Sequence, residues 1–300
     1  MKSVPILDLA RDDAALAPPL HAAFTDIGFV AVTGHGVRRP LIDDLYRAAG
    51  AFFDLPEPAK QAVARRRPEH NRGYVAIGGE TLARLAGEET PPDHKEVYTI
   101  GPLDVPDSPY FAAPEAYPSF VPNLWPDAPA SLRPAMEAYW HAVTALAGRL
   151  LGIAALSLGL PRDYFAARTD RHISMLRLIC YPPYRAEPRP GQLRAGVHTD
   201  LNMLTLVHAD SDTGGLEVRA RDGTWIAPVT SGRLGQAPPV GAVLLPGQLR
   251  HAGRVPAVLR RARCGPEVPA GHRRRLPRRA VRPHGKRVAP RQAVRRPFFR

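Results

Sequence analysis

The segment "GVHTDLNMLTL", residues 196–206, contains a histidine and an aspartate two positions apart, His198 and Asp200, directly before an apolar run. On an extended strand, residues i and i+2 point to the same side, so an imidazole nitrogen and a carboxylate oxygen would face one metal ion together. With one more distant histidine, this pair would form the two-histidine-one-carboxylate triad that holds non-haem Fe(II) and leaves positions open for dioxygen chemistry. Two polar residues at a strand end would give the same pattern.

The same spacing occurs again at once, at His208 and Asp210. An HxD pair is expected about once by chance in a chain of this kind, so the motif alone is weak. The second pair lies beyond the apolar run and before "SDTGG", and we interpret it as a solvated loop edge. We interpret other residues able to do chemistry as structural: His35 in a glycine turn, His172 at the start of a strand, Trp225 in the core and Gly78–Gly79 in a loop.

Charge divides the chain near residue 231. The formal net charge is +13, but residues 232–300, the basic segment, contain 17 Arg and one Lys against one acid, Glu267, so the first 231 residues carry a net charge of −4. The basic segment contains no Asp, Asn, Ser, Thr, Ile, Met, Trp or Tyr. It is either a disordered basic extension or the product of a GC-rich gene translated out of frame beyond about residue 231.

Length and composition favour a globular protein. A chain of 300 residues is long enough to bury a sizeable core. It has no run of about 18 apolar residues, so we expect no membrane span. The N-terminus lacks the pattern of a signal peptide, which predicts a cytoplasmic protein. Two cysteines argue against a zinc cluster built on thiolates.

The hydrophobic period changes from helical to extended along the chain. We expect helices over 12–26, 40–54, 57–66 and 130–158, and apolar residues recur at helical spacing over 40–54 and 130–158. Residues 67–128 are rich in Pro and Gly and predict loops with short elements. We expect strands, from alternation and β-branched content, at 4–10, 29–37, 174–181, 201–209, 216–220 and 224–229. Closely spaced strands of this kind are typical of an antiparallel sandwich or jelly roll.

Eight blocks, in order from about residue 4 to 230, resemble the isopenicillin-N-synthase-like branch of the Fe(II)/2-oxoglutarate-dependent dioxygenases. They are "VPILDL", "FTDIGFVAVTGHGV", "AAFFDLPEPAKQA", "RGYVAIGGE", "DHKEVYTIG", "NLWPD", "LRLICYPPY" and "VHTDLNMLTLVHADSDTGGLEVRARDGTWIAPV". Each block is weak alone, but their order is specific.

The resemblance implies an α+β fold, a double-stranded β-helix (a distorted jelly roll) with a helical N-terminal region. It divides the chain into an N-terminal dioxygenase region, 1–128, a helix with the jelly-roll core, 129–231, and the basic segment, 232–300. The basic segment stands where the rest of the core should be, and we expect the strands that close the barrel to be absent from it. A jelly roll without those strands would expose unpaired edges.

The resemblance also implies roles for single residues. His198 and Asp200 become the first two Fe(II) ligands. Tyr181 falls where the family places a tyrosine near 2-oxoglutarate, and Arg177, which alternates with it along one strand face, could reach the same cosubstrate. The alternative for Tyr181 and Arg177 is packing at a sheet edge.

The second histidine ligand of the family has no strong match. His251, 51 positions after Asp200, has the best spacing, while His272 and His284 come later. The alternative for each is a histidine in a disordered basic tail. The family's Arg-x-Ser pair, whose arginine clamps the far carboxylate of 2-oxoglutarate, is absent because no serine follows Ser231. Losing such a buried charged pair costs about 2–5 kcal/mol, so we expect weak activity or none.

The function implied by the resemblance is oxidation of a small organic substrate with O2, Fe(II) and 2-oxoglutarate, by hydroxylation, desaturation or cyclisation. One branch of the family uses no 2-oxoglutarate, and without the clamp that branch stays open. The alternative is a non-catalytic basic protein that binds nucleic acid or another polyanion through the basic segment. We favour the enzyme, with no membrane partner and no nucleic acid.

Overall fold

The computed structural model describes residues 3–87, 89–184, 186–200, 202–209, 215–228, 240–244 and 257–261, with only the backbone of the last two segments. All of these residues belong to one compact unit, Met1–Gly265. His251, His272, His284 and Asp210 lie outside the described residues, so the predictions made for them stay predictions.

The helices of the described chain are α1 (Asp13–Asp26), α2 (Arg39–Phe53), α3 (Glu57–Gln61), α4 (Pro109–Ala112) and α5 (Leu132–Ser157). Four of these five helices lie in the predicted ranges, and the fifth, α4, is a short helix in the stretch expected to be mostly loops. Asp12 caps α1, because its carboxylate accepts hydrogen bonds from the backbone N–H groups of Ala14 and Ala15. Only α3 is clearly shorter than the predicted range of 57–66.

The strands form one large sheet and one small hairpin. The large sheet has the order β1-β2-β9-β6-β10-β5-β4-β3, and the hairpin pairs β7 with β8. Their bounds are β1 Ile6–Asp8, β2 Phe29–Thr33, β3 Gly73–Val75, β4 Glu96–Ile100, β5 Leu176–Cys180, β6 Leu204–Ala209, β7 Val218–Arg219, β8 Trp225–Ile226, β9 Val240–Leu244 and β10 Ala257–Arg261.

The sheet differs from the predicted antiparallel arrangement in two ways. First, it is mixed, because β1 runs parallel to β2 and β10 runs parallel to both β5 and β6. Second, the basic segment supplies two strands, β9 and β10, although we expected no strands there. Their sequences, VGAVL and AVLRR, have the β-branched and apolar content of strands even in an arginine-rich context.

Strands β3 and β4 lie within the region expected to be mostly loops. Every residue of β4 is buried, so its sequence EVYTI lacks the alternation of a half-exposed strand. Tyr98 and Ile100 face the main core, while Val97 packs with Ile179 and Tyr181 in a separate small cluster. Both faces of the sheet are therefore covered at β4, and they have different surroundings.

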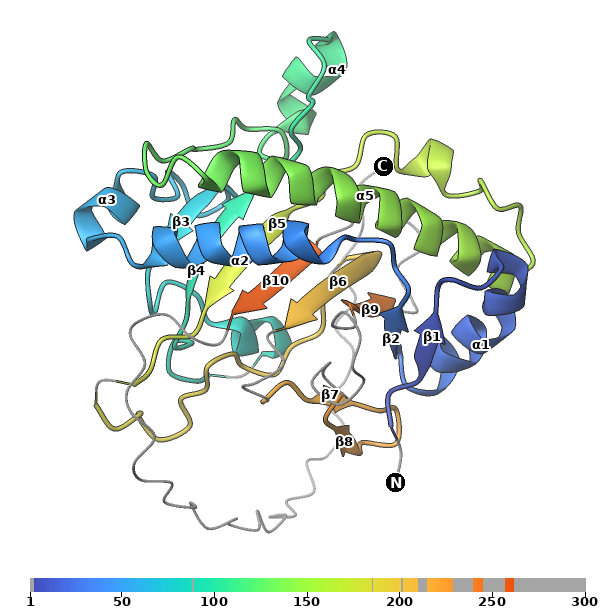
Figure 1. The fold of residues 1–300 in the computed structure, drawn as a ribbon. Coiled ribbons are helices and arrows are strands. Elements are labelled where there is room, and N and C mark those ends of the chain that lie inside the picture. Colours follow the sequence, from blue (N-terminus) through green and yellow to red (C-terminus); the bar gives the residue numbers. More distant parts are fainter. Residues whose placement is uncertain are drawn as a thin grey trace, which may run out of the picture. The chain divides into compact units, whose positions relative to one another are not determined.

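Helices α2 and α5 lie across one face of the large sheet (Figure 1). The stripe predicted on α5 is buried in full: Leu132, Met136, Tyr139, Trp140, Val143, Leu146, Leu150 and Ile153. By length and composition alone α5 could cross a membrane, but this burial is that of a core helix. The expectation of no membrane span stays a prediction.

We predict that Met136→Ala lowers the free energy of unfolding by about 2–5 kcal/mol, because Met136 is fully buried and its loss leaves a cavity. Urea unfolding at constant pH measures the change. Leu158→Ala is the control, since Leu158 is exposed just beyond α5 and should change stability by less than about 0.5 kcal/mol. Equal effects of the two substitutions would contradict the packing of α5 described above.

Candidate functional site

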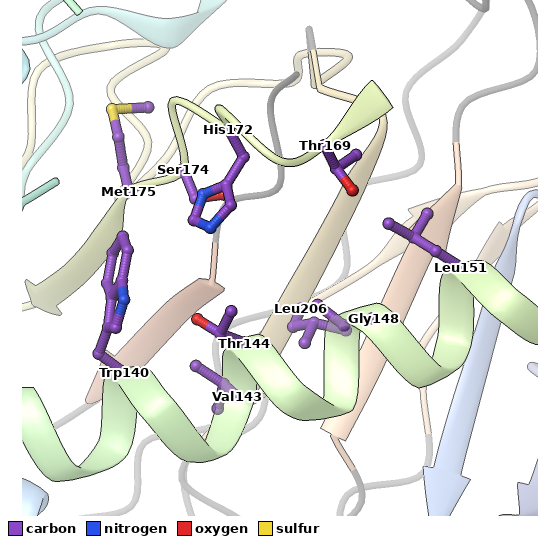
Figure 2. Close-up of a pocket in the computed structure, with 11 residues that line it drawn as sticks. Trp140, Val143, Thr144, Gly148, Leu151, Thr169, His172, Ser174, Met175 and Leu206 are labelled. Carbon is purple, nitrogen blue, oxygen red and sulfur yellow. The ribbon is translucent and has the colours of Figure 1, made fainter. Parts of the chain in front are cut away.

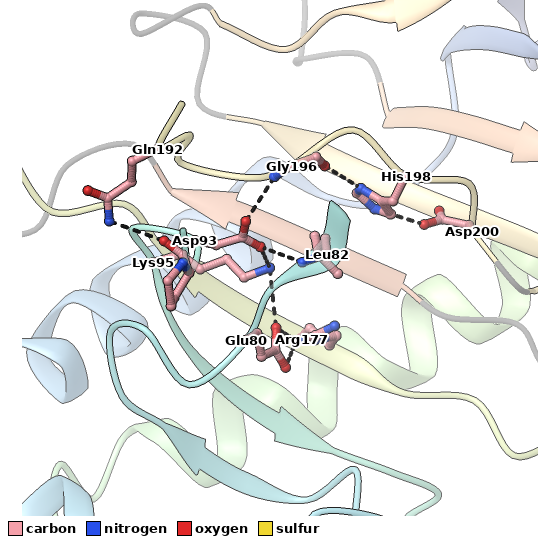
Figure 3. Close-up of polar contacts among 10 residues, drawn as sticks. Glu80, Leu82, Asp93, Lys95, Arg177, Gln192, Gly196, His198 and Asp200 are labelled. Carbon is pink, nitrogen blue, oxygen red and sulfur yellow. Dashed lines mark hydrogen bonds and ion pairs between the residues drawn. The ribbon is translucent and has the colours of Figure 1, made fainter. Parts of the chain in front are cut away.

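His198 and Asp200 lie in the extended segment just before β6 rather than on a strand. Their side chains nevertheless converge, with His198 Nε2 lying 3.3 Å from Asp200 Oδ1 (Figure 3). Two donors bound at about 2.1 Å to one divalent ion at right angles would lie about 3 Å apart. The two side chains therefore converge as the two-residue spacing predicted, at a separation that suits one metal ion, and their role as metal ligands stays a prediction.

A backbone carbonyl orients the imidazole of His198. Nδ1 of His198 lies 2.8 Å from the carbonyl oxygen of Gly196. A carbonyl only accepts hydrogen bonds, so Nδ1 carries a proton, and Nε2, which faces Asp200, is the ring nitrogen that could bind a metal. Metal-binding histidines are usually oriented by a hydrogen bond of this kind on the other ring nitrogen.

Gly196 is required where it stands. A Cβ atom built on it would lie 2.9 Å from the backbone nitrogen of Ala83, in the 3-10 helix η1 (Leu82–Ala86). Any side chain would push this segment away from η1. The glycine of "GVHTD" thus allows the close approach that places the His198 segment.

Asp93, just before β4, binds the segment that carries His198. Its carboxylate is 1% exposed and accepts hydrogen bonds from the backbone N–H of Gly196 at 3.0 Å and of Leu82 at 3.1 Å. Lys95, 2% exposed, lies 3.1 Å from the same carboxylate. A buried carboxylate is costly unless it is paired and hydrogen-bonded, and Asp93 has both kinds of partner.

The ion pairs continue to β5. Lys95 Nζ lies 3.2 Å from Glu80 Oε2, and Arg177 Nη2 lies 2.7 Å from both carboxylate oxygens of Glu80 (Figure 3). Burial by itself raises the pKa of Glu80, but the charges of Arg177 and Lys95 outweigh it and lower that pKa to about 2. Burial also lowers the pKa of Lys95, which the two neighbouring carboxylates oppose. Glu80, Asp93, Lys95 and Arg177 are called the ionic network below.

Of the two predicted cosubstrate residues, Arg177 lies on β5 and Tyr181 directly after it. Arg177 is engaged by Glu80, while its Nε is buried without a partner among the residues that the structure describes. Tyr181 is buried against Val97 and Ile179. Their predicted contact with 2-oxoglutarate stays a prediction.

The described part of the chain contains no candidate for a third metal ligand beside His198 and Asp200. No group of three His, Cys, Asp or Glu side chains able to hold a metal ion occurs there. The sequence-predicted third ligand, His251, lies outside that part.

Two interpretations of single residues are wrong. His208, expected at a solvated loop edge, is 3% exposed on β6, and its Nδ1 lies 2.7 Å from the hydroxyl of Tyr46 on α2. Burial lowers the pKa of His208 to about 4. Trp225, expected in the core, is 46% exposed on β8, because the small hairpin leaves that side of the strand uncovered.

The other structural interpretations fare better. His35 is buried in its turn, where its Nδ1 accepts a hydrogen bond from the backbone N–H of Val37. His172 lies before β5 rather than in it, and it lines a cavity of about 160 Å³ beside Trp140 of α5 (Figure 2). Most of the other described side chains around that cavity are apolar.

The ionic network could hardly be predicted from the sequence. Glu80, Asp93 and Lys95 lie in a stretch without periodicity, and their partners are distant in the chain. The one usable signal is the density of charge in "DHKE" directly before the apolar residues of β4, because charges that enter a buried strand need partners.

The chain is similar in sequence to known dioxygenases and hydroxylases. A sequence model of the family described as "non-haem dioxygenase in morphine synthesis N-terminal" matches residues 4–128. Validamycin A dioxygenase of Streptomyces hygroscopicus subsp. limoneus is 32% identical over 75% of this chain and 63% of its own length. Proline hydroxylase buaE of Petromyces alliaceus is 34% identical over 68% of this chain and 61% of its own length. The chain thus spans about three fifths of these relatives.

Solved structures resemble the chain as well. A full-length protein of Neurospora crassa, solved in complex with alpha-KG, has a TM-score of 0.66 and 28% identity, and the match covers 80% of this chain and 72% of that protein. The C-terminal truncated form of the same Neurospora crassa protein gives a TM-score of 0.63 and 26% identity, with 82% of each chain covered.

We predict that Glu80→Gln removes a pH-dependent part of the stability. The pKa of Glu80 falls from an ordinary 4.5 to about 2 on folding, so its contribution is complete above pH 4.5 and is lost as the pH falls toward 2. At 1.36 kcal/mol per pKa unit this amounts to about 3 kcal/mol. The free energy of unfolding should therefore fall less steeply with acid in the variant than in the wild type.

Urea unfolding at several pH values between 5 and 2.5 measures this difference. Glu115→Gln is the matched control, because Glu115 is exposed in the 3-10 helix η2 (Pro114–Ala116) and should leave the pH dependence unchanged. Parallel pH curves for the wild type and Glu80→Gln would show that the ionic network does not hold Glu80 ionised.

Proposed function

Since the chain belongs to the Fe(II)- and 2-oxoglutarate-dependent dioxygenase family, we propose that it is an oxygenase that oxidises a small organic substrate with O2. The observation that carries the proposal is the convergence of His198 Nε2 and Asp200 Oδ1 at 3.3 Å, with Nδ1 held by a carbonyl. Because Nδ1 donates its proton to that carbonyl, Nε2 is the ring nitrogen that can bind a metal, and Nε2 with the Asp200 carboxylate is a donor pair that suits a divalent ion.

Fe(II) would be held by His198 and Asp200, with His251 as the proposed third ligand. When bound, the metal supplies the activation of O2 and, together with 2-oxoglutarate, the oxidising power. The protein's own share is orientation. Gly196 fixes the imidazole, and Asp93 fixes Gly196 through its backbone N–H.

The residues proposed to contact the cosubstrate lie on β5 and directly after it. We propose Tyr181 as a neighbour of 2-oxoglutarate, in line with the resemblance. Arg177 already has its charge matched by Glu80, so only its Nε–H is available to a carboxylate. The chain lacks the Arg-x-Ser clamp, and the proposed activity is accordingly weak.

We also propose that the large sheet and the β7–β8 hairpin belong to a double-stranded β-helix, as the similarity to the Neurospora crassa structure supports. The proposed setting is the cytoplasm. The net charge of −4 on the first 231 residues favours a small molecule over a nucleic acid or an anionic membrane as the partner of this part.

We predict that His198→Ala weakens Fe(II) binding at least 100-fold, because it removes a nitrogen donor from a site with few protein ligands. Anaerobic calorimetric titration with Fe(II) measures the affinity, and succinate formed from 2-oxoglutarate measures turnover. Asp200→Ala should have a similar effect on both.

The matched control is His141→Ala, because His141 is exposed on α5, the helix that covers the opposite face of the sheet. It should bind Fe(II) as the wild type does. Fe(II) binding of equal strength in the wild type and in His198→Ala would refute the proposed metal site.

A further inference from the structure

Arg72, just before β3, is a buried cation without an acidic partner in the described chain. It is 3% exposed, and its guanidinium donates to two carbonyl oxygens, of Asn71 at 2.8 Å and of Ser119 at 2.7 Å. Its Nε has no hydrogen-bond partner among the described residues. Carbonyls satisfy N–H groups but do not neutralise the charge, and burial lowers the pKa of Arg72 to about 10. Buried charges in proteins are normally paired with an opposite charge.

Arg72 lines a small pocket over β3, β4 and β5, together with Arg65, Thr99 and Arg177. Two arginines of this pocket, Arg72 and Arg177, have a buried Nε without a partner among the described residues. The pocket volume of about 10 Å³ holds roughly one water-sized group. It therefore fits the end of a ligand rather than a whole molecule.

The single acidic residue among the described residues that line the pocket does not neutralise the charge of the arginines that line it. Glu80 lines the pocket, but Arg177 and Lys95 already engage its carboxylate. Arg65 is partly buried and makes no side-chain hydrogen bond or ion pair with any described residue. The charges of Arg65 and Arg72 are thus left for an anion.

The ionic network links this pocket to the candidate metal site. Glu80 binds Lys95, Lys95 binds Asp93, and Asp93 holds the segment that carries His198 (Figure 3). The pocket lies at the Arg177 end of β5, whereas Tyr181, the proposed neighbour of 2-oxoglutarate, lies four residues further on, about 13 Å along an extended strand. An anion in the pocket is therefore separate from Tyr181, and it would share with the cosubstrate only the Nε–H of Arg177.

We propose that this pocket binds a carboxylate of the primary substrate, with Arg72 and Arg65 supplying the positive charge. The proposal rests on the proposed function, since it names the substrate class of that enzyme. A planar guanidinium with a free N–H matches a carboxylate, and the small pocket admits one terminal oxygen-bearing group.

The test uses benzoate, phenylacetate and the N-acetylated amino acids, each paired with its primary amide, titrated into the full chain by calorimetry. At least one acid should bind the wild type at least tenfold more tightly than its amide. Arg72→Gln should weaken that acid at least tenfold, and Arg65→Gln should weaken it in the same direction. Arg66→Gln is the matched control, because Arg66 is exposed beside Arg65 and does not line the pocket.

A second readout separates a binding role from a structural one. A cation kept buried for a ligand is costly in the free protein, so Arg72→Met should leave the midpoint of thermal unfolding unchanged or raise it. A large fall would mean that Arg72 serves to hold Asn71 and Ser119 and would overturn the proposal. Arg65→Gln tests the pocket independently should an Arg72 variant fold poorly.

The remaining outcomes are equally decisive. Equal binding of acids and amides to the wild type would overturn the proposal. So would an Arg72→Gln variant that loses tenfold affinity for 2-oxoglutarate and none for the acids, because the pocket would then take the cosubstrate. Absence of Fe(II) binding with intact, Arg72-dependent binding of acids would defeat the proposed function and leave a carboxylate pocket of another protein.

Discussion

The buried carboxylate of Asp93 is the contact on which the candidate metal site depends. It holds the backbone N–H of Gly196, and the carbonyl of the same residue holds the imidazole of His198. Asp93 can remain buried because Lys95 lies beside it, and Lys95 can remain buried because Glu80 lies on its other side. Each buried charge is thus matched by the next, and the segment that carries His198 is held by these charged groups and their hydrogen bonds rather than by strand pairing.

The two faces of the large sheet carry different kinds of residues. One face meets α2 and α5 and holds the main apolar core. On β4 and β5 the other face carries Arg177, Ile179, Tyr181 and Val97, together with the ionic network. Charges gathered on one side of a rigid sheet keep their positions, which is what a site for a small charged molecule requires.

The sequence predicts side-chain burial and contacts best where they depend on residues of the same helix or segment. The stripe on α5 was correct residue by residue, and the two-residue spacing of His198 and Asp200 did bring their side chains together. It predicts them poorly where they depend on elements that are distant in the chain. His208 is buried because Tyr46 on α2 covers it, 162 positions away, and no local pattern records that. The strand β4 was missed because burial on both faces erases alternation, and the ionic network joins residues whose partners lie in other segments.

The most direct test of the account is proton NMR of the Co(II)-substituted chain, which reports how the metal is bound. Binding through Nε2 of His198 predicts a strongly shifted, exchangeable resonance from the Nδ1–H that donates to Gly196, absent in His198→Ala. A spectrum of the Co(II)-loaded wild type that matches that of His198→Ala would contradict the claim that this imidazole, set in place by Gly196 and Asp93, holds the metal.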